Sequence, residues 1–138
     1  METSIEASSE LKAGLKAETS ETVNEKNTAR FLGSGGLDVY ATPAMIALME
    51  KACARSVAPF LPAGASTVGT YLDVKHIAAS PLGAKIKAEG TLSGIDGRKL
   101  FFTVRAWDDA GMIGEGSHER FIIDDKKFMK KTEEKLGI

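Results

Sequence analysis

The stretch TPAMIALMEKACARSVAPF, Thr42–Phe60, decides the fold of this chain. Threonine can cap free backbone N–H groups and proline fits the first turn, so Thr42-Pro43 marks a helix start. Lys51 and Arg55 lie on one side of the predicted helix, and most of the remaining surface is alanine. The opposite side carries Met45, Met49, Cys53, Ser56 and Phe60. The pattern therefore predicts a helix that is buried nearly all round and wrapped by other elements.

Glu50 is the exception within this helix. It lies about 90° from the middle of the apolar stripe, and its neighbours three and four positions away include Ile46, Ala47 and Cys53. A carboxylate among such residues is costly to ionise unless a partner offsets its charge. Glu50 is therefore expected either to have such a partner or to favour its protonated form.

Length and composition set broad limits. A chain of 138 residues is expected to form one domain, here residues 11–138 after a polar, disordered tail of residues 1–10. The net charge of −1 gives no electrostatic basis for nucleic acid as a main partner. No apolar run is long enough to span a bilayer and the N-terminus lacks a signal-peptide pattern, so a soluble cytoplasmic protein is expected. A single cysteine excludes an intrachain disulfide and a cysteine-based zinc site.

After the Thr42–Phe60 helix the hydrophobic period changes from 3.6 to 2, which predicts strands. In the first of them, Val68, Leu72 and His76 are expected on one face and Tyr71 on the other. The expected strands are Lys12–Val23, Ser66–His76, Ala84–Leu92, Lys99–Trp107 and Met112–Ile123, with a short helical turn in Asn27–Leu32 and an amphipathic helix in Asp124–Leu136. Strands joined by hairpins form an antiparallel sheet whose apolar face needs a cover. The long helix is the available cover, so the predicted class is α+β with a hot-dog fold, a curved antiparallel sheet wrapped around one central helix.

Three segments resemble one known family. They are LDVYATPAMIALMEKACARSVAPFL, STVGTYLDVKHIAASPLG and EGSHERFII. Together they are similar to the hot-dog thioesterases of the fluoroacetyl-CoA thioesterase type, over about residues 11 to 128. The resemblance implies a catalytic set of Thr42, Glu50 and His76. It also implies substrate-binding positions at Gly69, beside the acyl group, and at Arg120, and it places the sites between two subunits.

The chain departs from that family just before the helix. The fluoroacetyl-specific branch carries phenylalanines there, which cover the acyl group, whereas this chain has Gly33, Ser34, Gly35 and Gly36. The resemblance therefore supports thioester hydrolysis better than it supports fluoroacetate as the acyl group.

Each candidate residue also has a structural interpretation. Thr42 alone fits a simple helix cap, and a lone histidine at the position of His76 fits a strand-edge residue. Glu50 favours a functional role, because a helical glutamate with no Lys or Arg three or four positions away is uncommon in such surroundings. His118, with its neighbour Glu119, is expected on a solvated strand face. Cys53 is expected to be a small buried hydrophobe rather than a nucleophile.

The predicted function is hydrolysis of a small acyl-CoA thioester, which makes the protein an acyl-CoA thioesterase. Glu50 would attack the carbonyl carbon or activate water, His76 would move the proton, and Thr42 would position the reacting group. No metal or redox cofactor is implied, since CoA is part of the substrate. The alternative is a non-catalytic acyl-CoA-binding module on the same fold.

A homodimer or higher oligomer is also predicted. A subunit of this kind leaves the helix and one sheet edge partly uncovered. Tyr71 and Trp107 are expected on the polar faces of their strands, where a partner subunit would cover them.

Overall fold

The computed structural model describes residues 7–138. Residues 1–6 of the expected disordered tail lie outside the described residues. Ser8 belongs to the part of that tail that the structure describes, and its backbone N–H donates to the carbonyl of Phe60 at 2.9 Å. The elements of the described part are β1 (Lys16–Thr22), α1 (Ala29–Leu32), α2 (Thr42–Val57), the 3₁₀ turn η1 (Ala58–Phe60), β2 (Ala65–His76), β3 (Lys85–Asp96), β4 (Lys99–Asp108), β5 (Gly111–Asp124) and α3 (Asp125–Glu134).

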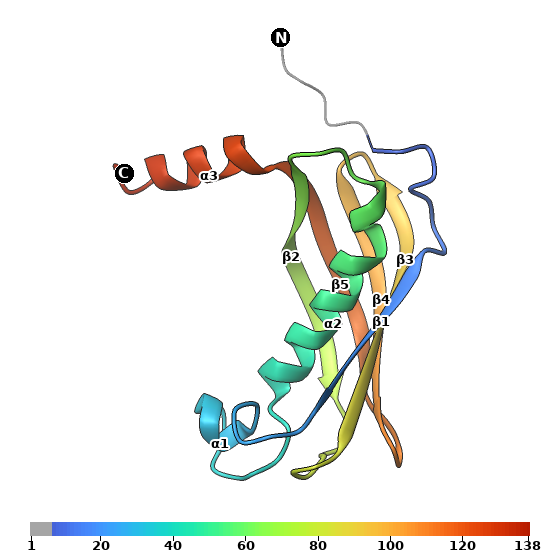
Figure 1. Cartoon of the computed structure of the whole chain (residues 1–138), viewed down its shortest axis with the longest axis vertical. Helices are drawn as coiled ribbons and strands as arrows, with labels where there is room; N and C mark the ends of the chain where they lie inside the picture. Colours follow the sequence, from blue (N-terminus) through green and yellow to red (C-terminus); the bar gives the residue numbers. More distant parts are fainter. Residues whose placement is uncertain (1–6) are drawn as a thin grey trace.

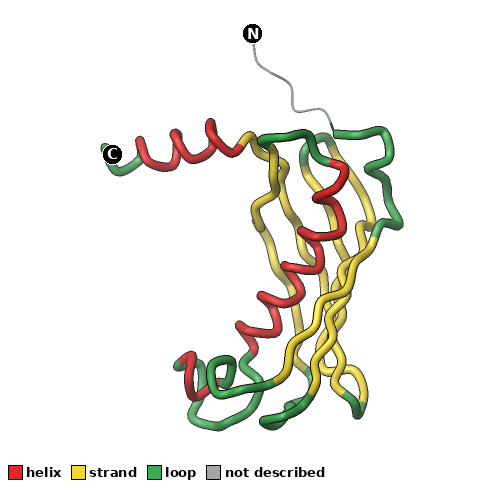
Figure 2. The backbone as a smooth tube through the Cα atoms, viewed as in Figure 1, coloured by secondary structure: helices red, strands yellow, loops and turns green. Residues whose placement is uncertain are grey.

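Within residues 7–138 the strands form one antiparallel sheet of five, in the order β1-β3-β4-β5-β2. Helix α2 crosses one face of this sheet along its length (Figures 1 and 2). It packs mainly against β3 and β1, and much less against β4 and β2. The predicted α+β class and hot-dog arrangement are therefore confirmed.

The apolar side of α2 forms the centre of the core. Seven of its residues are buried: Met45, Leu48, Met49, Ala52, Cys53, Ser56 and Val57. They meet the inward-facing residues of β4, which alternate as predicted: Leu100, Phe102, Val104 and Ala106. Gly90 on β3 permits the close approach, because a Cβ there would lie only 2.6 Å from Cys53 Sγ.

One expectation about α2 is wrong for the single chain. The helix is not buried nearly all round, because Pro43, Ala47 and Lys51 are exposed. The sheet covers one side of the helix, and within residues 7–138 no second layer covers the other. The alanine-rich surface that predicted burial therefore faces away from the sheet.

Strand β2 contains an irregularity that the alternating pattern does not show. Gly69 pairs with Arg120 and Leu72 pairs with His118, and the register shifts just after Gly69. Residues directly opposite in an antiparallel pair point to the same side, so Gly69 and Leu72 share a face although they are three positions apart. The prediction that Val68 shares the face of Leu72 is therefore wrong, and Gly69 takes that place.

The last helix, α3, is capped by Asp124, whose Oδ1 accepts the Lys127 N–H at 3.1 Å. It extends away from the sheet (Figure 1), and none of the residues Asp125–Glu134 is buried. The amphipathic helix predicted in this region is present. Its apolar residues Phe128 and Met129 are 38% and 50% exposed, so the described chain leaves them largely uncovered.

Candidate active site

The start of α2 meets the end of β2. Thr42 Oγ1 and His76 Nδ1 lie 2.7 Å apart and share a hydrogen bond. The residue that precedes the helix as its N-cap is Ala41, which makes no side-chain hydrogen bond to the helix end. The hydroxyl of Thr42 therefore pairs with an imidazole instead of capping the helix, which contradicts the simple capping interpretation.

His76 is half-buried, and its two ring nitrogens have different surroundings. Nε2 is buried and meets no hydrogen-bond partner among residues 7–138. Burial lowers the pKa of His76 below its usual value of 6.5, while the nearby backbone of Ala78 acts in the opposite direction. The imidazole is therefore mainly neutral at pH 7 and able to accept a proton.

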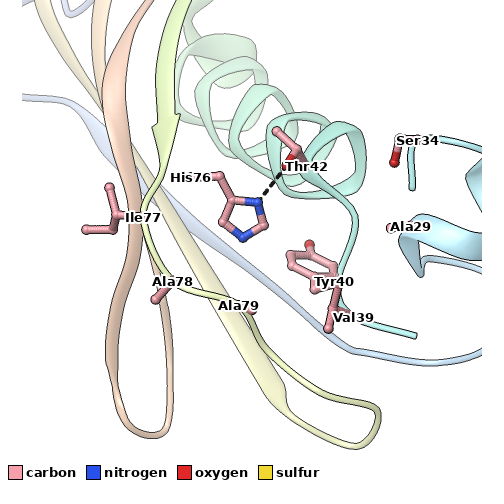
Figure 3. Close-up of a pocket in the computed structure, with 9 residues that line it drawn as sticks. All are labelled: Ala29, Ser34, Val39, Tyr40, Thr42, His76, Ile77, Ala78 and Ala79. Carbon is pink, nitrogen blue, oxygen red and sulfur yellow. Dashed lines mark hydrogen bonds between the residues drawn. The ribbon is translucent and has the colours of Figure 1, made fainter. Parts of the chain in front are cut away.

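A pocket of about 320 Å³ opens beside this pair (Figure 3). Thr42 and His76 lie on its wall next to the Tyr40 ring, and Ala29 and Ser34 form the side across from them. The remaining lining residues are Val39, Ile77, Ala78 and Ala79. A mainly apolar wall with a few polar groups is typical of a small-molecule site.

Glu50 lies in a second cluster, farther along α2. Its Oε2 is 3.3 Å from Arg120 Nη1, so of the two alternatives predicted for Glu50, a charged partner or a protonated form, the structure supplies the partner, Arg120. The Glu50 side chain remains 35% exposed, while that of Arg120 is 10% exposed. A carboxylate that is paired and still accessible is well placed to act as a nucleophile or a base.

Gly69 lies against this cluster. A Cβ at this position would be 2.5 Å from Glu50 Oε2 and 3.4 Å from Arg120 Nη1. Any larger residue would displace the carboxylate. Gly69 therefore provides the space in which Glu50 and Arg120 meet.

His118 also belongs to the cluster, and the expectation that it faces solvent is wrong. It is 1% exposed, and its Nε2 lies 3.1 Å from Arg120 Nη1 and 3.8 Å from Glu50 Oε2. A usable signal was present in the sequence, since His118 and Arg120 fall on the same period-2 face of β5 as the buried Ile122.

Two other chemical possibilities are limited by the structure. Cys53 is fully buried, and burial raises the pKa of its thiol to about 12, so the thiolate is scarce at neutral pH. Among the residues that the structure describes, no group of three or more His, Cys, Asp or Glu side chains is arranged to hold a metal ion.

None of the helices in residues 7–138 has the length and apolar character that a membrane crossing needs.

The structure thus places the candidate residues in two clusters. Thr42 and His76 are together, and Glu50, Gly69 and Arg120 are together. Thr42 and Glu50 are eight residues apart on α2, which corresponds to about 12 Å along the helix axis. Within one chain, Glu50 contacts Arg120 and His118 rather than His76.

The two histidines give the protein a predictable response to acid. Burial lowers the pKa of both His76 and His118 in the folded state. Below about pH 6.5 the unfolded chain therefore binds more protons than the folded chain, and stability falls as the pH drops through that value. We expect the melting temperature to decrease from about pH 8 to pH 5.5.

A variant without both histidines is the control, and it should lose most of this decrease. The hydrogen bond from Ser80 is the main cause of the lowered pKa of Asp108. The contribution of Asp108 to the stability of the fold is lost only when the pH falls below the usual pKa of an aspartate, which is outside the range of this experiment. A wild-type melting temperature that stays constant over this range would contradict the assignment of both histidines as neutral.

Comparison with known proteins agrees with this architecture. A family model described as fluoroacetyl-CoA-specific thioesterase matches residues 23–126. The fluoroacetyl-CoA thioesterase of Streptantibioticus cattleyicolor is 41% identical over 98 residues, which cover 71% of this chain and 70% of the relative. A solved structure of the fluoroacetyl-CoA thioesterase FlK superimposes with a TM-score of 0.85 at 34% identity, covering 91% of this chain and 97% of that one. A hot-dog-like protein from Thermanaerovibrio acidaminovorans shares the fold, with a TM-score of 0.83 at 22% identity over 91% of this chain and 93% of that one.

The sheet wrapped on α2 and these likenesses together define a hot-dog-fold thioesterase. Both the family model and the curated relative extend over most of the chain, and the residues that the family model matches include the start of α2, β2 and β5. The chain belongs to the fluoroacetyl-CoA-specific thioesterase family.

Proposed function

We propose that this protein hydrolyses a small acyl-CoA thioester to the free acid and CoA, with Thr42, Glu50 and His76 as the catalytic residues. The observation that carries the proposal is the Thr42–His76 hydrogen bond on the wall of the pocket at the start of α2. Family membership supports the thioester as substrate. A solved structure of a variant of the fluoroacetyl-CoA-specific thioesterase contains fluoroacetate and CoA, which supports an acyl-CoA ligand for this fold.

Hydrolysis needs three things from the site. The first is a nucleophile or base, which is Glu50: its carboxylate attacks the carbonyl carbon, or it takes a proton from the attacking water. The second is a proton for the departing CoA thiolate, and His76 is its proposed carrier. If Glu50 acts as the base, the proton that it takes from the attacking water passes through His76 to sulfur; if Glu50 attacks, the C–S bond breaks to leave a glutamyl–acyl anhydride, and His76 then takes a proton from the water that opens this anhydride and passes it to the thiolate. In both routes one water is consumed, the C–S bond breaks, and the acid and CoA thiol are released.

The third need is stabilisation of the negative charge that builds on the carbonyl oxygen. The first backbone N–H groups of a helix have no partner within the helix, and they lie at the positive end of its dipole. Ala41 provides no side-chain cap at this end of α2. Pro43 has no N–H, and the Ala41 N–H donates to the Asn27 carbonyl at 2.9 Å, so the N–H groups of Thr42 and Ala44 are the proposed oxyanion donors.

A homodimer explains why the two clusters are separate in one chain. Within the described residues, β2 is an edge strand with a neighbour, β5, on one side. Tyr71 and Leu72, halfway along it, are 49% and 41% exposed. An unpaired edge of twelve residues is a ready site for strand addition.

Antiparallel pairing of β2 with the same strand of a second copy is the proposed interface. Gly69, which marks the Glu50 cluster, and His76 lie on either side of the middle of β2. A two-fold axis near Leu72 would therefore bring His76 of one subunit toward Glu50 of the other. Each proposed site then takes Thr42 and His76 from one subunit and the carboxylate from its partner.

Thiol release tests the proposed function. Acetyl-, propionyl-, phenylacetyl- and fluoroacetyl-CoA are incubated with the protein, and free CoA is followed with a thiol reagent. Turnover of at least one of these esters is expected. Binding of the esters without release of CoA from any of them would instead favour the non-catalytic acyl-CoA-binding module.

The same panel tests the expected acyl range. The segment Gly33–Gly36 has no bulky side chain, and the pocket wall on this side consists of Ala29 and Ser34. The larger side chains nearby, Phe31 and Leu37, are 61% and 66% exposed and do not line the pocket. Selection of one fluorine by shape is worth only about 1–3 kcal/mol even in a tight pocket.

We therefore expect kcat/KM for fluoroacetyl-CoA to exceed that for acetyl-CoA by no more than about 100-fold. The bulkier propionyl ester should also be accepted. A kcat/KM that is many thousand-fold higher for the fluorinated ester than for acetyl-CoA would mean that residues outside Gly33–Gly36 close over the acyl group.

A further inference from the structure

His118 is a buried histidine that the proposed chemistry does not use. Its Nδ1 lies 2.8 Å from the backbone carbonyl oxygen of Tyr71. A carbonyl oxygen only accepts hydrogen bonds, so Nδ1 carries the proton. The lone pair of the neutral ring is then on Nε2, which lies 3.1 Å from Arg120 Nη1.

This arrangement requires the neutral form of His118. Protonation would place an N–H on Nε2 directly against a guanidinium N–H, so that two donors would face each other. Burial is the main cause of the lowered pKa of His118, and the charge of Arg120 acts in the same direction, against Glu50, Glu119 and the Tyr71 carbonyl. The 3.8 Å separation between His118 Nε2 and Glu50 Oε2 is therefore not an ion pair.

The guanidinium of Arg120 is held along both of its edges. Its Nε donates to Thr67 Oγ1 at 2.8 Å, and its Nη2 donates to the Thr67 carbonyl at 2.9 Å. Its Nη1 is directed at two acceptors, Glu50 Oε2 at 3.3 Å and His118 Nε2 at 3.1 Å. Thr67 fixes one side of the group, and His118 provides the acceptor that keeps Nη1 beside the carboxylate.

We propose that His118 is a positioning residue: its unprotonated Nε2 holds the Arg120 guanidinium against Glu50, and so fixes the carboxylate for attack. The inference rests on the proposed function of Glu50. It assigns a role to a side chain that does not line the pocket beside Thr42 and whose Nε2 lies 3.8 Å from Glu50 Oε2, too far for a hydrogen bond. The ring of Phe102 packs near that of His118, with 6.1 Å between their centroids.

Two matched substitutions separate positioning from a purely structural role. In His118→Gln, the side-chain oxygen can reach the place of Nε2 and accept from Arg120, but the donor to Tyr71 is lost. In His118→Asn, the side-chain amide keeps the donor near the place of Nδ1, but the acceptor for Arg120 is lost. Both remove the imidazole and both add an amide.

Positioning predicts that His118→Asn loses about 100-fold in kcat with little change in KM, since a misplacement of about 1 Å in a catalytic group has this effect. His118→Gln should keep kcat within about tenfold of the wild type. If His118 only anchors β2 through Tyr71, the ranking reverses. Equal losses in the two variants would also overturn the proposal.

A second measurement does not depend on turnover. Nuclear magnetic resonance of the Arg120 guanidinium should show separate, slowly exchanging Nη signals in the wild type and in His118→Gln, and averaged signals in His118→Asn. The His118 nitrogens should report a protonated Nδ1 at pH 7. If the wild type releases no CoA from any ester, the proposed function fails, while these signals still decide whether His118 holds Arg120.

Discussion

Replacing Glu50 with glutamine is expected to lower kcat for the best acyl-CoA ester by about 10³-fold or more. The amide keeps the shape of the side chain, and its oxygen can still accept the hydrogen bond from Arg120 Nη1. It can neither attack a carbonyl carbon nor take a proton from water. The measurement is thiol release under saturating substrate, together with the melting temperature of the same variant.

Glu119→Gln is the matched control. Glu119 is next to Arg120 on β5, but its Oε1 pairs with Lys99 at 3.1 Å. The substitution removes the same charge from the same neighbourhood, and kcat should stay within about twofold of the wild type. A Glu50→Gln protein with near-normal turnover and a clearly lower melting temperature would show that Glu50 is structural.

The periodicity of apolar residues predicted the helices and strands, because burying one face of a helix or strand places apolar residues at the spacing of that element. The inward positions of β4 and the apolar side of α2 were predicted from alternation and from helical spacing, and both are buried. The bulge after Gly69 has no such signal, since one extra residue changes the face without changing the composition. Alternation alone therefore assigned Val68 to the wrong side of β2.

The site was predictable in part for a similar reason. Glu50 stood out because a carboxylate on a mostly apolar helix needs a partner, and Arg120 supplies it. His118 was missed because polar residues at alternating positions usually indicate a solvated face. Here His118 and Arg120 are buried and share a hydrogen bond with each other. Glu50 and His76 do not contact each other in one chain because they lie at different distances along α2 and β2. The types of these residues in the sequence carry no information on that separation.

The division of the site into two clusters leads to the second large effect. Glu50→Gln and His76→Asn are each expected to be nearly inactive alone, and a hybrid dimer of the two is expected to regain activity. In such a hybrid, one site combines the intact His76 of one subunit with the intact Glu50 of the other, and the second site contains both substitutions. Random mixing makes half of the dimers hybrid with one working site of two, so about a quarter of the wild-type activity should return.

The experiment mixes the two purified variants under conditions that exchange subunits, then measures thiol release and mass by light scattering. The mass should be about twice the 14.7 kDa of one chain before and after mixing. Two tagged copies allow the hybrid to be isolated, and its activity should be about half that of the wild-type dimer. Activity that stays at the level of the separate variants in a proven hybrid would place Glu50 and His76 of the same chain in one site, and a monomeric mass would exclude the shared site altogether.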